Sequence, residues 1–128
     1  MIVDKSQVYA KPAPLDLNQW ALTGDWTVGK ERAVLDQPNG GIAFQFHARD
    51  LHLVLGPAWD GKPVHFRVRI DGKPPGEDHG VDTDADGNGT IDGQRLYQLV
   101  RQQGRVADRQ FEIEFQDAGA QAFAFTFG

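Results

Sequence analysis

The stretch GIAFQFHARDLHLVLGP (Gly41–Pro57) alternates apolar and polar residues in two successive runs. The apolar positions that share one side of these runs are Ile42, Phe44, Phe46, Ala48, Leu51, Leu53 and Leu55. A period of two residues is the pleat of a strand that buries one face. Ala48-Arg49-Asp50 separates the runs, and Gly56-Pro57, a turn signal, ends the second. The stretch therefore predicts two neighbouring β-strands.

Three further runs repeat the pattern: VHFRVRI (Val64–Ile70), FEIEF (Phe111–Phe115) and AFAFTF (Ala122–Phe127). RLYQLV (Arg95–Val100) fits either a strand, with Tyr97 and Leu99 on one side, or a short helix, and its neighbours favour the strand. No segment carries a long stripe with helical spacing. The sequence thus predicts an all-β fold, an antiparallel β-sandwich in which each sheet has one solvated face.

Composition narrows the functional classes. The 128 residues suggest one domain. There is no cysteine, which excludes disulfides, thiolate metal sites and thiol catalysis. A net charge of −5 argues against nucleic acid as a partner. No apolar run approaches the roughly 20 residues of a membrane span, and no signal peptide is visible at the start, so direct membrane insertion is not expected.

The domain boundary is expected near residue 15. Residues 1–14, which include Lys-Pro-Ala-Pro at Lys11–Pro14, suit an N-terminal linker or flexible segment. Residues 15–128 form the predicted sandwich domain.

The stretch DADGNGTIDGQR (Asp84–Arg95) resembles an EF-hand loop, with oxygen-bearing side chains at the first, third and fifth positions and glycine at the sixth. The twelfth position, however, is Arg95 instead of the bidentate glutamate, and the flanks are not helical. A looser Ca²⁺ site remains a hypothesis, with Asp82, Asp84, Asp86, Asn88 and Asp92 as its candidate ligands. The alternative is a turn-rich connection, because aspartate, asparagine and glycine favour tight turns. No other cofactor is expected.

Four stretches and the chain's ending occur together in one order: QWALTGDWTVG, FHARDLHLVLGP, FRVRIDGKPPGEDHGVD, RLYQLVRQ and FEIEFQDAGAQAFAFTFG. They resemble the C-terminal domain of bacterial DipZ-like proteins and related thioredoxin-family proteins, over residues 15–128. The resemblance implies a jelly-roll, galactose-binding-like sandwich similar to carbohydrate-binding modules. It also implies an upstream thioredoxin-like domain in a parent protein that can be tethered to the membrane, and an extracytoplasmic location on the periplasmic or cell-envelope side. The redox chemistry of such a parent needs a Cys-x-x-Cys motif, which this chain lacks.

Sugar sites combine exposed aromatic rings with planar polar groups. The candidate ligand-binding residues are Trp59, Arg67, Arg69, His79, Asp82, Arg95 and Tyr97. The alternative for Arg67 and Arg95 is a salt bridge with Asp82 or Asp86. The alternative for Trp59 is a rim residue that shields the core, and for Trp20 and Trp26 we expect core or edge packing.

Catalysis by this domain is not expected. His47, His52 and His65 alternate with apolar residues, so the strand pattern places them on solvated faces. Glu112 and Glu114 share a strand face, which exposed alternation explains without glycosidase chemistry. We therefore predict a non-catalytic accessory domain that binds carbohydrate or cell-envelope glycan. The alternative is a protein-interaction module that docks on the thioredoxin-like domain or forms a homodimer.

Overall fold

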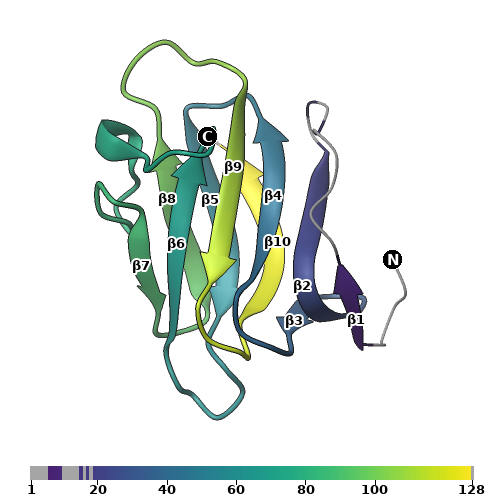
Figure 1. Cartoon of the computed structure of the whole chain (residues 1–128). Helices are drawn as coiled ribbons and strands as arrows, with labels where there is room; N and C mark the ends of the chain where they lie inside the picture. Colours follow the sequence, from purple (N-terminus) through teal and green to yellow (C-terminus); the bar gives the residue numbers. More distant parts are fainter. Residues whose placement is uncertain (1–5, 10–14, 16, 18, 128) are drawn as a thin grey trace.

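The computed structural model describes residues 6–9, 15, 17 and 19–127 (Figure 1). The strands are β1 (Ser6–Tyr9), β2 (Trp20–Val28), β3 (Ala33–Leu35), β4 (Gly40–Phe46), β5 (Asp50–Gly56), β6 (Val64–Ile70), β7 (Asn88–Ile91), β8 (Arg95–Arg101), β9 (Arg109–Phe115) and β10 (Gln121–Phe127). A short 3-10 turn, η1, spans Gly76–Asp78. All five alternating runs of the sequence are strands, and the ambiguous RLYQLV segment forms a further strand, β8.

The strands form two layers, and every pairing is antiparallel (Figure 1). One layer has the order β7-β6-β9-β4 and ends on the first half of β2. The other has the order β8-β5-β10-β3 and ends on the second half of β2, with β1 beyond it. The predicted antiparallel β-sandwich of the jelly-roll type is therefore confirmed.

Strand β2 belongs to both layers. Trp20–Thr23 pairs with β4, whereas Trp26–Val28 pairs with β3. Gly24 lies at the crossing, with a φ of 97° that side chains disfavour. A Cβ at this position would come within 2.6 Å of the Gly40 Cα. Glycine is thus required where the strand passes from one layer to the other.

The core lies between the layers, and in β4, β5, β6, β8 and β9 it is built from the side that the sequence pattern marked as apolar. Its largest fully buried side chains are Trp26, Tyr97, Phe46, Phe66, Phe111 and Phe115. Val100 is a correction, because alternation placed it opposite Tyr97 and Leu99, yet it is fully buried. The register of β5 against β8 shifts between Leu51 and His52, and this bulge turns Val100 inward.

The N-terminal segment is more structured than the sequence suggested. Within the predicted linker 1–14, Ser6–Tyr9 forms β1 and pairs with Gly24–Thr27 of β2. An edge strand offers unpaired backbone groups, which explains why this short segment adds to the sheet. The other residues of 1–14 lie outside the described part of the chain, and the boundary at residue 15 stays a prediction.

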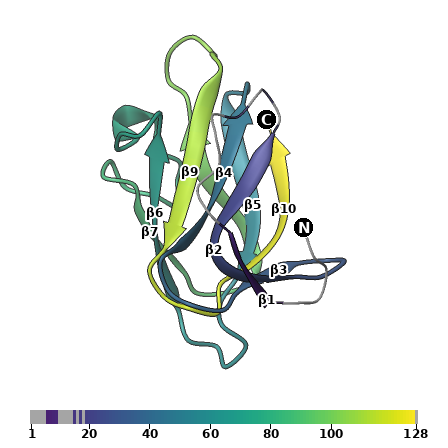
Figure 2. The same ribbon diagram turned by 45° about the vertical axis from the view of Figure 1, so that its right-hand side comes forward.

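On one side of the sandwich the two layers do not close on each other, and we call the gap between β2 and β10 there the seam. Strand β3 has only three residues, and it reaches β10 only at Gln121 and Ala122. Beyond that point, among the described residues, no strand joins β2 to β10. Figure 2 turns this side of the sandwich towards the viewer.

Candidate functional site

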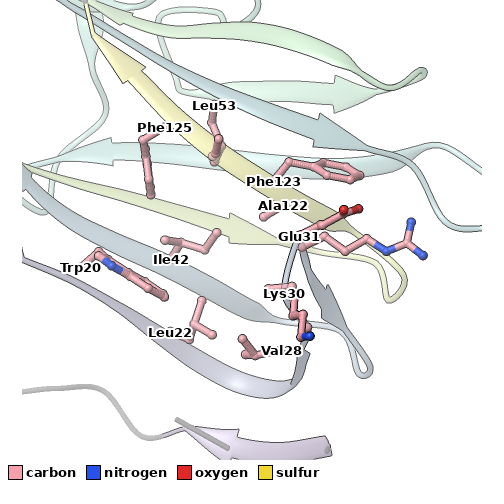
Figure 3. Close-up of a pocket in the computed structure, with 14 residues that line it drawn as sticks. Trp20, Leu22, Val28, Lys30, Glu31, Ile42, Leu53, Ala122, Phe123 and Phe125 are labelled. Atoms are coloured by element: carbon pink, nitrogen blue, oxygen red, sulfur yellow. The ribbon is translucent and has the colours of Figure 1, made fainter. Parts of the chain in front are cut away.

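The seam holds a groove with a volume of about 340 Å³ (Figure 3). Core side chains such as Leu22, Ile42 and Leu53 form its floor. Trp20 lies at one end, and Lys30 and Glu31 of the β2–β3 hairpin lie at the other (Figure 3). The groove is thus an apolar opening with charged groups at a single end.

Trp20 is a groove residue that the sequence did not identify as a candidate for binding. It was expected to pack in the core or at an edge, as Trp26 does, but 44% of its surface is exposed. The signal that would have identified it is the absence of clean alternation in β2, which changes layers at Gly24. Trp26, by contrast, is fully buried, and its indole Nε1 donates to the Thr23 carbonyl at 2.7 Å.

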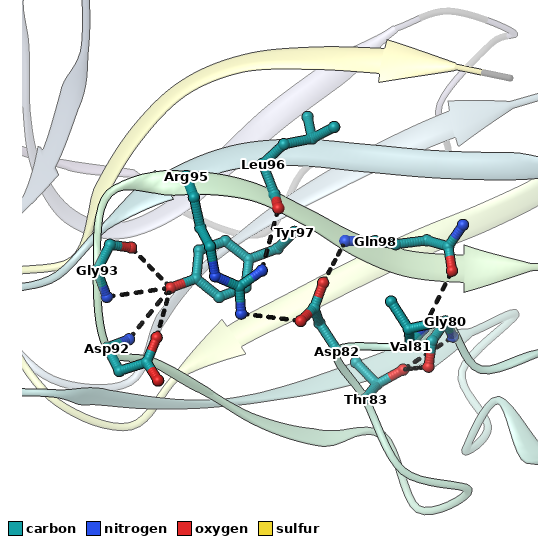
Figure 4. Close-up of polar contacts among 10 residues, drawn as sticks. All are labelled: Gly80, Val81, Asp82, Thr83, Asp92, Gly93, Arg95, Leu96, Tyr97 and Gln98. Atoms are coloured by element: carbon teal, nitrogen blue, oxygen red, sulfur yellow. Dashed lines mark hydrogen bonds and ion pairs between the residues drawn. The ribbon is translucent and has the colours of Figure 1, made fainter.

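Three of the predicted ligand-binding residues meet at the β8 edge, where they bind one another (Figure 4). The Arg95 Nη2 lies 2.9 Å from the Asp82 Oδ1, and the Arg95 Cζ lies 3.8 Å from the Tyr97 ring centroid. The other Asp82 oxygen accepts the Gln98 backbone N–H at 2.7 Å. The hydrogen bond that Arg95 donates to Asp82 raises the pKa of Arg95 above its usual value. The salt-bridge alternative for Arg95 is therefore confirmed.

Tyr97 does not offer a ring for sugar stacking. It is fully buried, and its ring packs edge-on against Phe66. Its hydroxyl accepts the backbone N–H groups of Asp92 and Gly93 at 3.1 and 3.2 Å and lies 2.7 Å from the Gly93 carbonyl. The prediction that Tyr97 belongs to an exposed sugar site is wrong, because the β7–β8 turn folds onto its hydroxyl.

The segment before the acidic loop protects the free edge of β8. The backbone N–H groups of Gly80 and Asp82 donate to the carbonyls of Leu99 and Gln98, each at 3.1 Å. His79, half-buried beside them, has its Nδ1 2.7 Å from the Gly80 carbonyl. Covered edges resist pairing with other chains. We therefore read His79 and Asp82 as parts of this cover.

The acidic loop is a set of turns. The Asp84 Oδ1 accepts the backbone N–H groups of Asp86 at 3.0 Å and Asn88 at 2.9 Å. The Asp92 carboxylate lies beside the Tyr97 hydroxyl, and Asp82 binds Arg95. In the part of the chain that the structure describes, no group of three or more histidine or acidic side chains is placed to hold a metal ion. The turn-rich alternative accounts for this loop without calcium.

Arg67 and Arg69 lie apart from that cluster, on the outer face of β6. They stand opposite Glu114 and Glu112 of β9 in the register. The Arg67 Nε donates weakly to the Asp86 backbone carbonyl at 3.4 Å, and not to a carboxylate. The proposed salt bridge of Arg67 with Asp82 or Asp86 is therefore wrong, and the strand places this arginine on a solvated face.

Trp59 is the most exposed large apolar residue that the structure describes, at 93%. Its loop, between β5 and β6, is anchored just before Trp59, where the Gln121 side chain donates to the Pro57 carbonyl at 2.8 Å. The Gly61 N–H donates to the Ala58 carbonyl at 2.8 Å and closes a turn around Trp59. Ala58 also packs against Gly119 of the β9–β10 turn, so closely that a Cβ there would lie 2.6 Å away. An exposed indole is thus presented on an anchored loop.

A polar pair joins the start of β6 to the β9–β10 turn. The Asp117 Oδ2, in the β9–β10 turn, accepts the His65 backbone N–H at 2.8 Å and lies 2.9 Å from the His65 Nδ1. These contacts, the backbone hydrogen bond foremost, lower the pKa of Asp117 below its usual value. His65 is the first outward side chain of β6, in line with Arg67 and Arg69.

The remaining histidines do not gather with these groups. His47 is exposed and lies 2.6 Å from the Asp108 carboxylate, and His52 is half-buried on the outer face of β5. The prediction that His47, His52 and His65 point away from the core is confirmed. No helix among the described residues is long and apolar enough to cross a membrane.

The fold defines a class, a jelly-roll β-sandwich of the kind found in solved carbohydrate-active enzymes. It is similar to a family two carbohydrate esterase from Clostridium thermocellum in complex with cellohexaose, with a TM-score of 0.62, 13% identity and coverage of 86% of this chain. An active site mutant of a family two carbohydrate esterase from the same organism, also in complex with a cellohexaose-type ligand, matches with a TM-score of 0.62, 12% identity and coverage of 87%. This chain spans about a third of either esterase, 31% of its length.

The chain belongs to the family described as the thioredoxin-like C-terminal domain, whose model matches residues 1–128. No curated protein matches the sequence. The family confirms the expected accessory domain of thioredoxin-like proteins, while the esterases, at such low identity, establish the fold alone.

Proposed function

We propose that this domain is a non-catalytic carbohydrate-binding module and that Trp59 is its stacking platform. The observation that carries the proposal is the 93% exposure of an indole on a loop that hydrogen bonds and the Ala58–Gly119 contact hold in place. Leaving a large apolar ring in water forgoes about 1.5–3 kcal/mol of burial. A fixed, exposed ring is what the apolar face of a sugar stacks on, at little cost in entropy.

Polar groups for the sugar hydroxyls stand on the adjoining strand. The Asp117 carboxylate, ionised at neutral pH, remains about half exposed beside His65. Arg67 and Arg69 extend the same row along the outer face of β6. Of the residues expected to bind sugar, we therefore retain Trp59, Arg67 and Arg69, add His65 and Asp117, and remove Tyr97, Asp82, Arg95 and His79.

The proposal includes the setting of the domain. Family membership supports a position beside a thioredoxin-like domain. A glycan ligand would suit an extracytoplasmic site in which the module holds its redox neighbour near the cell envelope. The absence of cysteine means that any thiol chemistry belongs to that neighbour.

The test is a titration of the ¹⁵N-labelled domain with soluble cello-, chito- and peptidoglycan-derived oligosaccharides. We expect localised shifts at the Trp59 indole, His65 and the β9–β10 turn, and at least a tenfold weaker Kd for Trp59→Ala, about 1.4 kcal/mol. Trp20→Ala is the matched control, because it removes the half-exposed indole of a different element, β2. Shifts that are absent for all three sugar classes, or equally lost in both variants, would refute the Trp59 site.

A second candidate function, docking of another polypeptide, is favoured by a different feature of the molecule, the groove at the seam.

A further inference from the structure

The outer edge of β10 lacks a neighbour at the seam. Ala124–Phe127 pair with Val54–Leu51 of β5 on one side. On the other side β3 covers only Gln121 and Ala122. In an antiparallel strand, alternate residues direct their N–H and C=O groups to opposite sides. No backbone hydrogen bond joins Ala124–Phe127 to another described segment on that free side.

The groove runs along this free edge and is apolar. Phe123 and Phe125 of β10 line it from one layer, and Trp20 and Leu22 of β2 line it from the other (Figure 3). The β10 edge lacks a hydrogen-bonding partner, and the groove beside it lacks an apolar side chain to cover it. A single added strand supplies both, since its backbone pairs with the edge and every second side chain points into the opening.

We propose that the groove between β2 and β10 binds an extended strand of another polypeptide, with apolar side chains at every second position, which pairs with the free edge of β10. The half-exposed indole of Trp20 closes over the bound strand.

The lining favours a peptide over a sugar in this groove. Its charged side chains, Lys30, Glu31 and Arg32, all belong to the hairpin at one end, and the Arg32 Nη1 already donates to the Gln121 side chain at 2.8 Å. Sugar hydroxyls require polar side chains that converge on the ligand. Apart from the Trp20 indole, the other side chains that line the groove are apolar.

A second copy of this chain is a weaker fit for the same place. Its covered edge at β8 is already occupied by Gly80–Asp82. Its strands β6 and β9 lie inside a sheet, and the outer strand β7 exposes the polar side chains of Asn88 and Thr90. Pairing of two β10 edges would leave each groove unfilled, because Phe125 of either copy packs against its own core. The strand is therefore expected from a different polypeptide, and self-association becomes an outcome of the test.

The experiment uses the ¹⁵N-labelled domain and a pool of nine-residue peptides with valine, isoleucine or phenylalanine at every second position. Binding is expected to shift the amides of Ala124–Phe127 and the Trp20 indole, and to slow hydrogen exchange at least tenfold at the alternate amides that face the free edge. The same pool N-methylated at alternate residues should not bind, because it lacks the donors that pair with β10.

Two variants complete the design. Trp20→Ala should weaken peptide binding at least tenfold, whereas Trp59→Ala should leave it unchanged. No shift at β10 with the pool, undiminished binding of the N-methylated pool, or the same shifts produced by an oligosaccharide would each overturn the proposal. Shifts at β10 that grow with protein concentration alone would overturn it in favour of a second copy. The N-methylated control uses the unmodified protein, so it stays decisive even if Trp20→Ala fails to fold.

Discussion

Arg95 lies between Asp82 and the face of Tyr97, with its guanidinium 2.9 Å from the carboxylate and its Cζ 3.8 Å from the ring centroid. The arginine at the position where an EF-hand would place its glutamate therefore neutralises an aspartate and covers a buried ring. Residues that sequence analysis assigned to ligand binding are here part of the sandwich edge.

The Asp82–Arg95 contact predicts a modest coupling free energy between these two side chains in the stability of the domain. Arg95→Gln should lower the free energy of unfolding by about 0.5–1.5 kcal/mol, because the Arg95 side chain is about half exposed, so that its ion pair and its cation–π contact each contribute little. Asp82→Ala should lower the free energy of unfolding by more, about 1–3 kcal/mol, since it also leaves the Gln98 N–H without its acceptor. Urea unfolding of both single variants and the double variant checks this. Additive effects in that cycle would contradict a direct contact.

Removal of the Tyr97 hydroxyl is expected to lower the free energy of unfolding clearly. Tyr97→Phe keeps the ring but leaves the N–H groups of Asp92 and Gly93 without their acceptor, at an expected cost of about 1–3 kcal/mol. Hydrogen exchange should accelerate at those two amides while the core strands stay protected. Tyr9→Phe is a matched control, since the Tyr9 hydroxyl has no hydrogen-bond partner among the described residues. Equal losses in the two variants would count against this role for Tyr97.

Asp84 is expected to stabilise the loop as a turn residue. Asp84→Ala should lower Tm by a few degrees, because two backbone N–H groups lose their acceptor, and Asp84→Asn should retain most of the stability. Both differences should be the same in millimolar Ca²⁺ and in EDTA. A Ca²⁺-dependent rise in the Tm of the unmodified domain that Asp84→Ala abolishes would revive the calcium site.

The His65–Asp117 pair predicts a pH-dependent contribution. Because the folded pKa of Asp117 lies below its unfolded value, its ionised form adds stability that is present above the unfolded pKa of about 3.9 and is lost as pH falls through the folded pKa. The stability difference between the unmodified domain and Asp117→Asn should therefore be present at pH 5 and shrink below about pH 4. Urea midpoints at a series of pH values measure it; a difference that grows towards low pH would have the wrong sign.

The alternation of apolar and polar residues predicted the strands well, because a strand with one face on the core carries an apolar residue at every second position. It failed locally at Val100, where a bulge breaks the period, and at β2, where one strand serves two layers. It also failed for Trp20, whose exposure depends on β3 ending after three residues. Such features depend on the register between strands far apart in the chain, which a period of two does not encode.

By itself the sequence determined the all-β class, the inward and outward faces of most strands, the turn-rich nature of the acidic loop and the exclusion of thiol chemistry. Only the tertiary structure decided that Arg95 meets Asp82, that Tyr97 is covered, and that β10 has a free edge beside a groove. The physical reason is that local pattern tells on which side of a strand a residue lies, whereas its neighbours on that side come from distant segments. Those neighbours decide whether a polar or aromatic group is already satisfied or remains free to bind.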